Sequence, residues 1–349
     1  MIKLEVIFKL LTIVMFYCSI MQVSGAHEKD PVSIKRKVSN NGPIVAKLLG
    51  LLSDFVDKDK KRYIDQQTLL FENTIQKLKA LQQTPETKEF LEIVEEDSKN
   101  VGFFSYPTDS EVDVKKLDEE KQRILFEQIY VTMPLEEIEQ VYGKFQVIPL
   151  RRLDKDCLIL GCGNEVTELF SKQGLLYHGG HSDADTIDIS VLENPSIVAN
   201  FDLPGVFDYI ANLGKTYKSV IEESRFNLDG ARLEYLRKIL AVGGNYRSGS
   251  KSFAIHIIAK SFENLAFNYI EQSQERPILV IDDEEYEKLS KLDGEELYQQ
   301  ILVHLIDFYK LRGFELTKEP GKKIVKHAVN KKWTEIHLKG NSIGLKRAR

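Results

Sequence analysis

Residues 155–164 read Lys-Asp-Cys-Leu-Ile-Leu-Gly-Cys-Gly-Asn, and the rest of the chain can be interpreted outward from them. The apolar run Cys157–Leu160 predicts a short buried strand. Gly161 and Gly163 follow it and predict a tight turn, because a residue without a Cβ lets the backbone bend sharply and approach a ligand closely. The apolar spacing in Glu165–Lys172 then predicts a helix. The order strand, glycine turn and helix is typical of nucleotide-binding folds.

A second short β-rich run lies about 25 residues further on and carries one acid. It comprises residues 186–189, Thr-Ile-Asp-Ile, with the acid at Asp188. An acid at the end of the second parallel strand can accept hydrogen bonds from both hydroxyls of a ribose. The helix that follows the glycine turn presents free N–H groups at its N-terminus. The two stretches together predict a nucleotide site at the carboxyl ends of two neighbouring strands.

The glycine pattern distinguishes two classes of nucleotide. NAD(P) sites use Gly-x-Gly-x-x-Gly, and this chain has Val166 at the last glycine position. The chain instead resembles class I S-adenosylmethionine (SAM)-dependent methyltransferases, with residues 158–164 similar to the Gly-Cys-Gly-Asn variant of their first motif. Further similar segments follow in order over roughly residues 150 to 340: 187–189 (second strand), 194–204 (third strand and its acid), 207–212 (fourth strand) and 236–244 (helix and turn before the fifth).

The resemblance implies a fold class and a cofactor site. We expect an α/β fold, a Rossmann-like mostly parallel sheet with a C-terminal antiparallel strand pair, preceded by an α-helical N-terminal subdomain. The expected cofactor is SAM. The family pattern implies that Asp188 binds the ribose, that Asp202 binds the adenine amino group unless Asn200 ends that strand, and that the glycine turn binds the amino-acid part of SAM. That turn comprises Gly161, Cys162, Gly163 and Asn164. Two positions depart from the family, Ile159 where many members carry an acid and Glu165 where a third glycine is usual.

The acceptor side is expected at the carboxyl ends of the strands, after the fourth one. We expect Asn212, Lys215 and Tyr217 to lie there, just after the predicted fourth strand at residues 207–212. The Asp/Asn-Pro-Pro-aromatic signature of many amino-group methyltransferases is absent from this position, where residues 212–215 read Asn-Leu-Gly-Lys. Substrate class therefore stays open, and Asn212 is as consistent with capping a loop as with binding a substrate.

The N-terminus predicts export. Met1–Ala26 combines Lys3 and Lys9, an apolar stretch too short to span a membrane, and a small-residue cleavage site before His27. We interpret residues 1–26 as a signal peptide, with an uncleaved anchor as the alternative, and expect a secreted or exported protein without a transmembrane domain in the mature chain. Residues 27–41 are polar and are predicted to be a linker.

The remaining chain divides into two parts. Residues 42–149 show helical spacing, with helix boundaries at Thr84-Pro85 and Pro134 and a helix end at Gly143. Residues 150–349 alternate strand and helix and form the methyltransferase-like domain. Within it, we expect an inserted or edge strand at Ile278–Ile281 and a long helix from Asp293-Gly294. The C-terminal antiparallel pair is predicted to be residues 314–317 with 334–338, joined by a basic loop.

Composition narrows the function classes. The chain has 349 residues, 42% hydrophobic and 29% charged, with a net charge of −5, which argues against nucleic acid as the partner of the whole protein. The tail from Leu316 to Arg349 is strongly basic and could bind an acidic partner, although a solvated face is the more common use of such charge. Four polar residues precede Asp188 and could ligate a metal, but we interpret them as a solvated loop and expect no metal site: His178, His181, Asp183 and Asp185.

Two functions remain open at this point. The first is SAM-dependent methyl transfer to an unknown acceptor, a protein or a small molecule, by an exported enzyme. The second is a methyltransferase-like fold without catalysis that serves as a secreted binding module, since SAM is scarce outside cells. A third nucleotide-binding enzyme class is disfavoured by Val166.

Overall fold

The computed structural model describes residues 42–99, 131–161, 183–191, 195–223, 230–249, 252–266 and 277–349. The chain divides into two units, Met1–Lys47 and Leu48–Arg349, and the contacts below lie within the second. The described helices are α3 (Gly42–Ala80), α4 (Pro85–Lys99), α6 (Leu135–Phe145), α8 (Gly205–Asn212), α9 (Gly230–Ile239), α11 (Asp283–Lys291) and α12 (Gly294–Leu311). The predicted signal peptide and linker lie outside the described residues.

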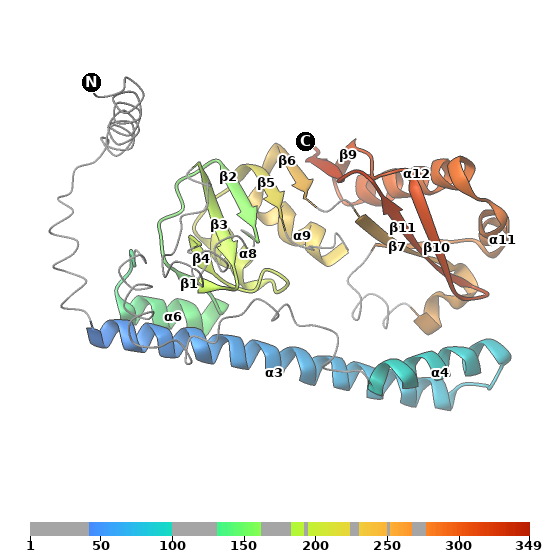
Figure 1. Cartoon of the computed structure of the whole chain (residues 1–349), viewed down its shortest axis with the longest axis horizontal. Coiled ribbons are helices and arrows are strands. Elements are labelled where there is room, and N and C mark those ends of the chain that lie inside the picture. The colour runs from blue at the N-terminus through green and yellow to red at the C-terminus, as the bar shows by residue number, and fades with distance from the viewer. Residues whose placement is uncertain are drawn as a thin grey trace, which may run out of the picture. The chain divides into compact units, whose positions relative to one another are not determined.

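The first sheet has eight strands in the order β1-β4-β3-β2-β5-β6-β12-β9 (Figure 1). Its strands are β1 (Ile148–Pro149), β2 (Cys157–Leu160), β3 (Ala184–Asp188), β4 (Ile197–Val198), β5 (Tyr217–Glu222), β6 (Leu240–Ser248), β9 (Phe314–Lys318) and β12 (Gly344–Arg347). The strands from β4 to β6 pair in parallel, and in chain order they run third, second, first, fourth, fifth. This is a doubly wound order whose switch point lies between β2 and β5. Strand β12 is antiparallel to both β6 and β9. The predicted fold class is confirmed.

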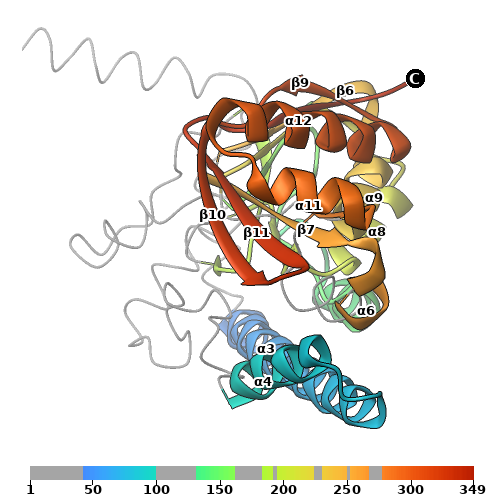
Figure 2. The ribbon, with the colours of Figure 1, turned by 90° about the vertical axis from the view of Figure 1, so that its right-hand side faces the viewer.

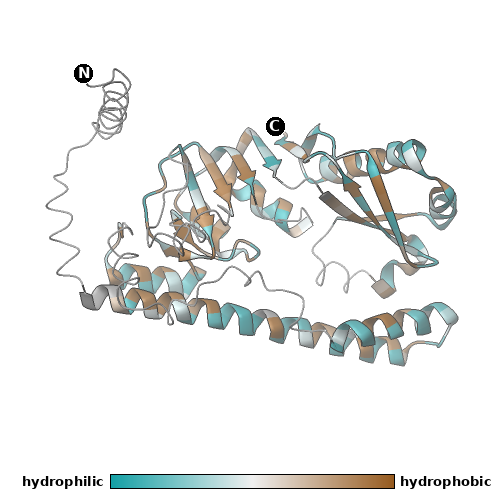
Figure 3. Cartoon of the chain, in the orientation of Figure 1, coloured by the Kyte–Doolittle hydropathy of each residue, from teal (hydrophilic) through white to brown (hydrophobic). Residues whose placement is uncertain are grey.

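Burial explains why the central strands form. Leu158 and Leu160 of β2 are fully buried, as is Val220 of β5. A parallel sheet is covered on both faces, so its strands are nearly continuous apolar runs rather than alternating ones. These residues share one core with the apolar faces of α8, α9 and α12, and the same strands are predominantly brown in the hydropathy view (Figure 3).

A second sheet of four strands has the order β10-β11-β7-β8. Its strands are β7 (Ser252–Ala259), β8 (Ile278–Ile281), β10 (Lys323–Asn330) and β11 (Trp333–Lys339). Strands β7 and β8 follow the fifth parallel strand, whereas β10 and β11 lie between β9 and β12, so two separate insertions build this sheet. Strands β10, β11 and β7 lie side by side, with α11 and α12 against them (Figure 2). The prediction of an inserted or edge strand at Ile278–Ile281 is confirmed, since β8 is the edge strand paired with β7.

The predicted C-terminal strand pair was half wrong. Strand β9 begins at Phe314 as expected, but its antiparallel partner is β12. Residues 334–338 belong to β11 of the second sheet, and the predicted basic loop contains strand β10. Alternation in β11, where Ile336 and Leu338 are buried, predicts a strand correctly but does not specify which sheet it joins.

The predicted fourth strand was also wrong. Residues 207–212 lie in helix α8, and the fourth parallel strand is β5. A short apolar run does not by itself distinguish a buried strand from one side of a short helix. Val206, Phe207 and Ile210 are all buried at helical spacing after Pro204.

Of the predicted helix boundaries, one at Thr84-Pro85 was correct and one at Gly143 was wrong. Thr84-Pro85 does begin α4, and the Thr84 hydroxyl accepts a hydrogen bond from the Thr87 N–H at 3.2 Å. Gly143, in contrast, lies inside α6, which ends at Phe145 and is followed by its capping residue Gln146 in the left-handed conformation with φ 57°.

Helix α3 packs on α6, and helix α4 packs on the second sheet. Phe55 of α3 contacts Tyr142 of α6 edge to face, with ring centres 5.8 Å apart. Phe90 of α4 contacts Trp333 of β11 in the same manner at 5.8 Å. Ile258 of β7 completes this second contact region, which forms a buried cluster separate from the main core. The helices therefore complete a core instead of standing apart from it.

Asp59 on α3 gives a prediction about pH and stability. Burial raises its pKa from 3.8 to about 6, against the opposing charge of Arg62. Between about pH 4 and pH 6 the folded state therefore holds a proton that the unfolded state has lost, so the free energy of unfolding falls as pH rises through this window. We expect Asp59→Asn to raise the free energy of unfolding by about 2 kcal/mol at pH 7 and to change this free energy little near pH 3.5. Urea denaturation at both pH values measures this, with Asp57→Asn, an exposed acid on the same helix, as control. An equal gain from both variants at pH 7 would contradict the assignment.

Candidate nucleotide site

The first two parallel strands end side by side. Leu160, the last residue of β2, is paired with Ile187 of β3. The next residue, Gly161, donates its backbone N–H to the Ile187 carbonyl oxygen at 2.9 Å and has φ 71°. Residues with a Cβ rarely adopt this φ, so a glycine is required where the chain leaves the strand. The predicted tight turn therefore begins where the sequence places it. Cys162, Gly163 and Asn164 lie outside the described residues.

Asp188 is the last residue of β3 and lies beside this turn. Its Oδ1 accepts a hydrogen bond from the Ser190 N–H at 2.8 Å, and its backbone carbonyl accepts one from the Ala199 N–H at 2.9 Å. The first contact fixes the direction of the carboxylate, and the second ties β3 to the end of β4. The side chain is half-buried. Gly161 and Asp188, the two residues predicted from sequence, thus lie together at the carboxyl ends of the parallel strands.

Asp202 occupies the turn between β4 and α8 and forms an ion pair. Its Oδ1 accepts a hydrogen bond from Arg232 Nη2 at 2.6 Å, and the arginine side chain is only 3% exposed. Asn200 stabilises the same turn, because its Oδ1 accepts the Asp202 N–H at 2.9 Å. One oxygen of Asp202 therefore ties this turn to α9. The contact of Asp202 with adenine stays a prediction.

The residues predicted to bind the acceptor lie at the amino ends of the parallel strands, opposite to Gly161 and Asp188. The fourth strand, β5, begins at Tyr217, so Asn212 and Lys215 precede this strand and Tyr217 opens it, instead of following it. Asn212 Nδ2 donates to the Asp208 carbonyl oxygen at 2.6 Å, which is a helix-end contact. The placement of all three at the carboxyl ends of the strands was wrong, for the same reason that the fourth strand was misplaced.

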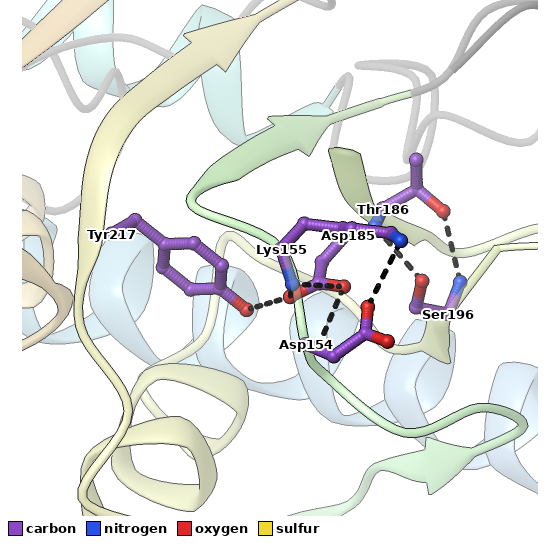
Figure 4. Close-up of polar contacts among 6 residues, drawn as sticks. All are labelled: Asp154, Lys155, Asp185, Thr186, Ser196 and Tyr217. Atoms are coloured by element: carbon purple, nitrogen blue, oxygen red, sulfur yellow. Dashed lines mark hydrogen bonds and ion pairs between the residues drawn. The ribbon is translucent and has the colours of Figure 1, made fainter. Parts of the chain in front are cut away.

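Tyr217 instead helps to hold the amino ends of the strands (Figure 4). Its hydroxyl donates to Asp185 Oδ2 at 3.0 Å, and the backbone N–H groups of Asp154 and Lys155 also donate to this carboxylate at 3.2 to 3.4 Å. Burial raises the pKa of Asp185, while the Tyr217 hydroxyl and the two N–H groups lower it. Asp185 thus anchors the segment that leads into β2, rather than contributing to a polar loop as predicted.

Three buried polar residues near the candidate nucleotide site were not predicted from the sequence. Glu222 ends β5, Ser248 ends β6, and Arg232 lies in the first turn of α9; all three are buried. Glu222 could have been noticed as an acid that closes the apolar run Val220-Ile221, but only after β5 had been assigned as the fourth strand.

The described residues contain neither a metal-ligand cluster nor a helix that could span a membrane. No three His, Cys, Asp or Glu side chains in the described ranges are grouped as a metal would require. His178 and His181 lie outside those ranges. Within the same part of the chain, every helix is too short or too polar to span a lipid bilayer.

The chain resembles some solved structures, but only with low TM-scores. No protein-family model matches the chain, and no curated protein matches it. One similar solved structure is geranyl diphosphate methyltransferase in complex with GPP and sinefungin, at 8% identity, covering 61% of this chain and 78% of that chain with a TM-score of 0.22. Another is geranyl diphosphate C-methyltransferase from Streptomyces coelicolor A3(2) with Mg2+, geranyl diphosphate and S-adenosyl-L-homocysteine, at 11% identity, 67% and 85% coverage and a TM-score of 0.21. TM-scores this low do not establish a common fold, so the fold assignment rests on the strand order of this chain.

Proposed function

We propose that this chain binds SAM and transfers its methyl group to an acceptor, either a protein or a small molecule. The observation that carries the proposal is the strand order, in which the first and second parallel strands bring the Gly161 turn and Asp188 to one edge while β12 runs antiparallel between β6 and β9. That sheet has the antiparallel C-terminal pair that the resemblance to class I methyltransferases implies.

Gly161 and Asp188 suit the two parts of SAM that the resemblance assigns to them, the amino-acid part and the ribose. The backbone at Gly161 is free of a Cβ and can approach a ligand closely. The half-buried Asp188 carboxylate, held by the Ser190 N–H, can accept hydrogen bonds from two ribose hydroxyls. When bound, SAM supplies an already activated methyl group, so the chain has to orient the acceptor and exclude water more than it has to supply a base.

The acceptor is instead proposed to bind at the carboxyl ends of β5 and β6. Parallel sheets bind ligands across the switch point at the carboxyl ends of their strands. With β5 correctly placed, the residues there are Glu222 and Ser248, whereas Asn212, Lys215 and Tyr217 lie at the far edge. The acceptor itself is not specified by these groups.

Export and an acidic partner are further parts of the proposal. Export is supported by the signal-like residues 1–26 alone. For the basic tail, several cations already have partners within the chain: Lys322 with Glu295, Lys332 with Asp283, Lys326 with the Ser290 and Leu292 carbonyls, and Lys318 with Ser342. Any acidic partner would therefore have to engage other residues of the tail, such as the exposed Lys331, Lys339 and Lys346.

Calorimetric titration of SAM, S-adenosylhomocysteine (SAH) and NAD into the full chain tests the cofactor. We expect micromolar binding of SAM and SAH and no binding of NAD. Transfer of label from methyl-tritiated SAM to candidate acceptors then tests catalysis. If the folded protein bound neither SAM nor SAH, the enzyme proposal would be wrong, and the fold would be interpreted as a binding module.

A further inference from the structure

Glu222 lies at the switch point of the sheet. It is the last residue of β5 and is paired on one side with Leu160 of β2 and on the other with Ser248 of β6. The N–H of the following residue, Glu223, donates to the Leu160 carbonyl oxygen at 2.9 Å. Since Gly161 follows Leu160 directly, Glu222 ends its strand beside the turn that is proposed to bind SAM.

The Glu222 carboxyl group is fully buried, with 0% of the residue exposed. Its Oε2 accepts a hydrogen bond from Ser248 Oγ at 2.8 Å. The Ser248 hydroxyl favours the ionised form of this acid, whereas burial opposes it. A charge on Glu222 also acts on its surroundings: burial raises the pKa of Tyr246, the Glu222 charge raises it further, and Arg232 lowers it.

We propose that Glu222 lets the cofactor site distinguish SAM from SAH by charge. Its buried carboxylate attracts the cationic sulfonium of SAM but not the neutral thioether of SAH. This inference rests on the proposed function. A unit charge in a buried site acts on another charge several times more strongly than the same charge in water, since the effective dielectric constant is lower. Glu223 is the natural comparison, because it adjoins Glu222 in sequence but is exposed.

Methyl transfer removes the positive charge that the Glu222 carboxylate attracts. Methyl transfer breaks the sulfur–methyl bond, forms the bond from the acceptor to the methyl carbon and leaves the electron pair on sulfur. The positive charge thereby leaves the sulfur and passes to the acceptor, or departs from the acceptor as a proton. The attraction to Glu222 is lost by the spent cofactor, so SAH is released more readily than SAM.

Calorimetric titration of three probes tests this: SAM, SAH and sinefungin, which carries an ammonium group near the position of the sulfonium. The proteins are the full-length wild type, Glu222→Gln, and Glu223→Gln as a matched control with the same loss of charge. We expect the wild type to bind SAM and sinefungin about tenfold more tightly than SAH. In Glu222→Gln this preference should fall to about twofold or less, with the SAH affinity nearly unchanged. Glu223→Gln should keep the wild-type preference.

Ser248→Ala separates charge from hydrogen bonding, since it removes the Ser248 donor but leaves the acid. It is expected to keep most of the preference for SAM. The inference is wrong if the wild type binds SAH as tightly as SAM, a result that does not depend on any variant folding, or if folded Glu222→Gln keeps the full preference. Failure of the wild type to bind all three probes would instead overturn the proposed function.

Discussion

Asp188→Ala is expected to weaken SAM binding by about a hundredfold or more. Hydrogen bonds to a charged group contribute about 1.5 to 3 kcal/mol each, and every 1.4 kcal/mol is a factor of ten in affinity. Two such bonds to the ribose hydroxyls would be lost. The carboxylate is held in place by the Ser190 N–H at 2.8 Å, so it is already oriented before the ligand arrives. Calorimetric titration of SAM into the variant measures the loss.

Asp156→Ala is the control for this result. Asp156 lies just before β2, at the amino edge of the same sheet, and pairs with Lys218 on the surface at 2.6 Å. The variant removes the same charge from the chain but should leave SAM affinity within about twofold, because an exposed ion pair contributes little and lies far from the proposed site. Equal losses in the two variants would indicate a general effect of charge and would remove Asp188 from the site.

Trp333→Ala is expected to lower the free energy of unfolding by about 3 to 5 kcal/mol, the range for truncating a buried aromatic residue. The residue is 2% exposed and contacts the Phe90 ring. Its Nε1–H donates to His256 Nδ1 at 3.0 Å inside the same core, so truncation also removes a buried hydrogen bond. Urea denaturation followed by circular dichroism measures the change.

Trp333→Phe divides this effect into its parts. Phenylalanine keeps an aromatic ring against Phe90 but has no donor for His256, so we expect a loss of about 1 to 3 kcal/mol from the buried acceptor and the smaller ring. Leu311→Ala provides a surface control, since Leu311 is 85% exposed and its truncation should change stability by less than about 0.5 kcal/mol. A Trp333→Ala loss no larger than that of Leu311→Ala would show that the contact region does not support the fold.

The first two strands, and the glycine Gly161 at which the chain leaves the first of them, could be predicted from sequence because their signal is local. An apolar run, a glycine with φ 71° and an acid at a strand end are all read within a few residues. The same holds for Thr84, whose hydroxyl caps the helix that it precedes. In each case the residue that determines the structure lies next to the structure that it determines.

The acceptor side could not be predicted in this way because it depends on pairing between distant strands. Residues 207–212 have the composition of a strand, and only their packing against α6 and α9 shows them to be a helix. The pairing of Leu160 with Glu222 brings together residues separated by a long segment, and no local pattern specifies it. The same limit explains why β12 was missed, since its four residues Gly344–Arg347 contain only one buried large apolar side chain, Leu345.

The buried cluster around Trp333 also bears on the order in which a newly made chain can fold. Phe71 and Phe90 near the start of the described chain share this cluster with Trp333 near its end. During synthesis these N-terminal helices emerge early, yet their apolar side stays uncovered until β11 has left the ribosome. Contacts between such distant segments slow folding and leave hydrophobic surface exposed in the meantime. The nascent chain is therefore expected to need a chaperone on its first helices for most of its synthesis, and a chain that stops before β11 should aggregate through them.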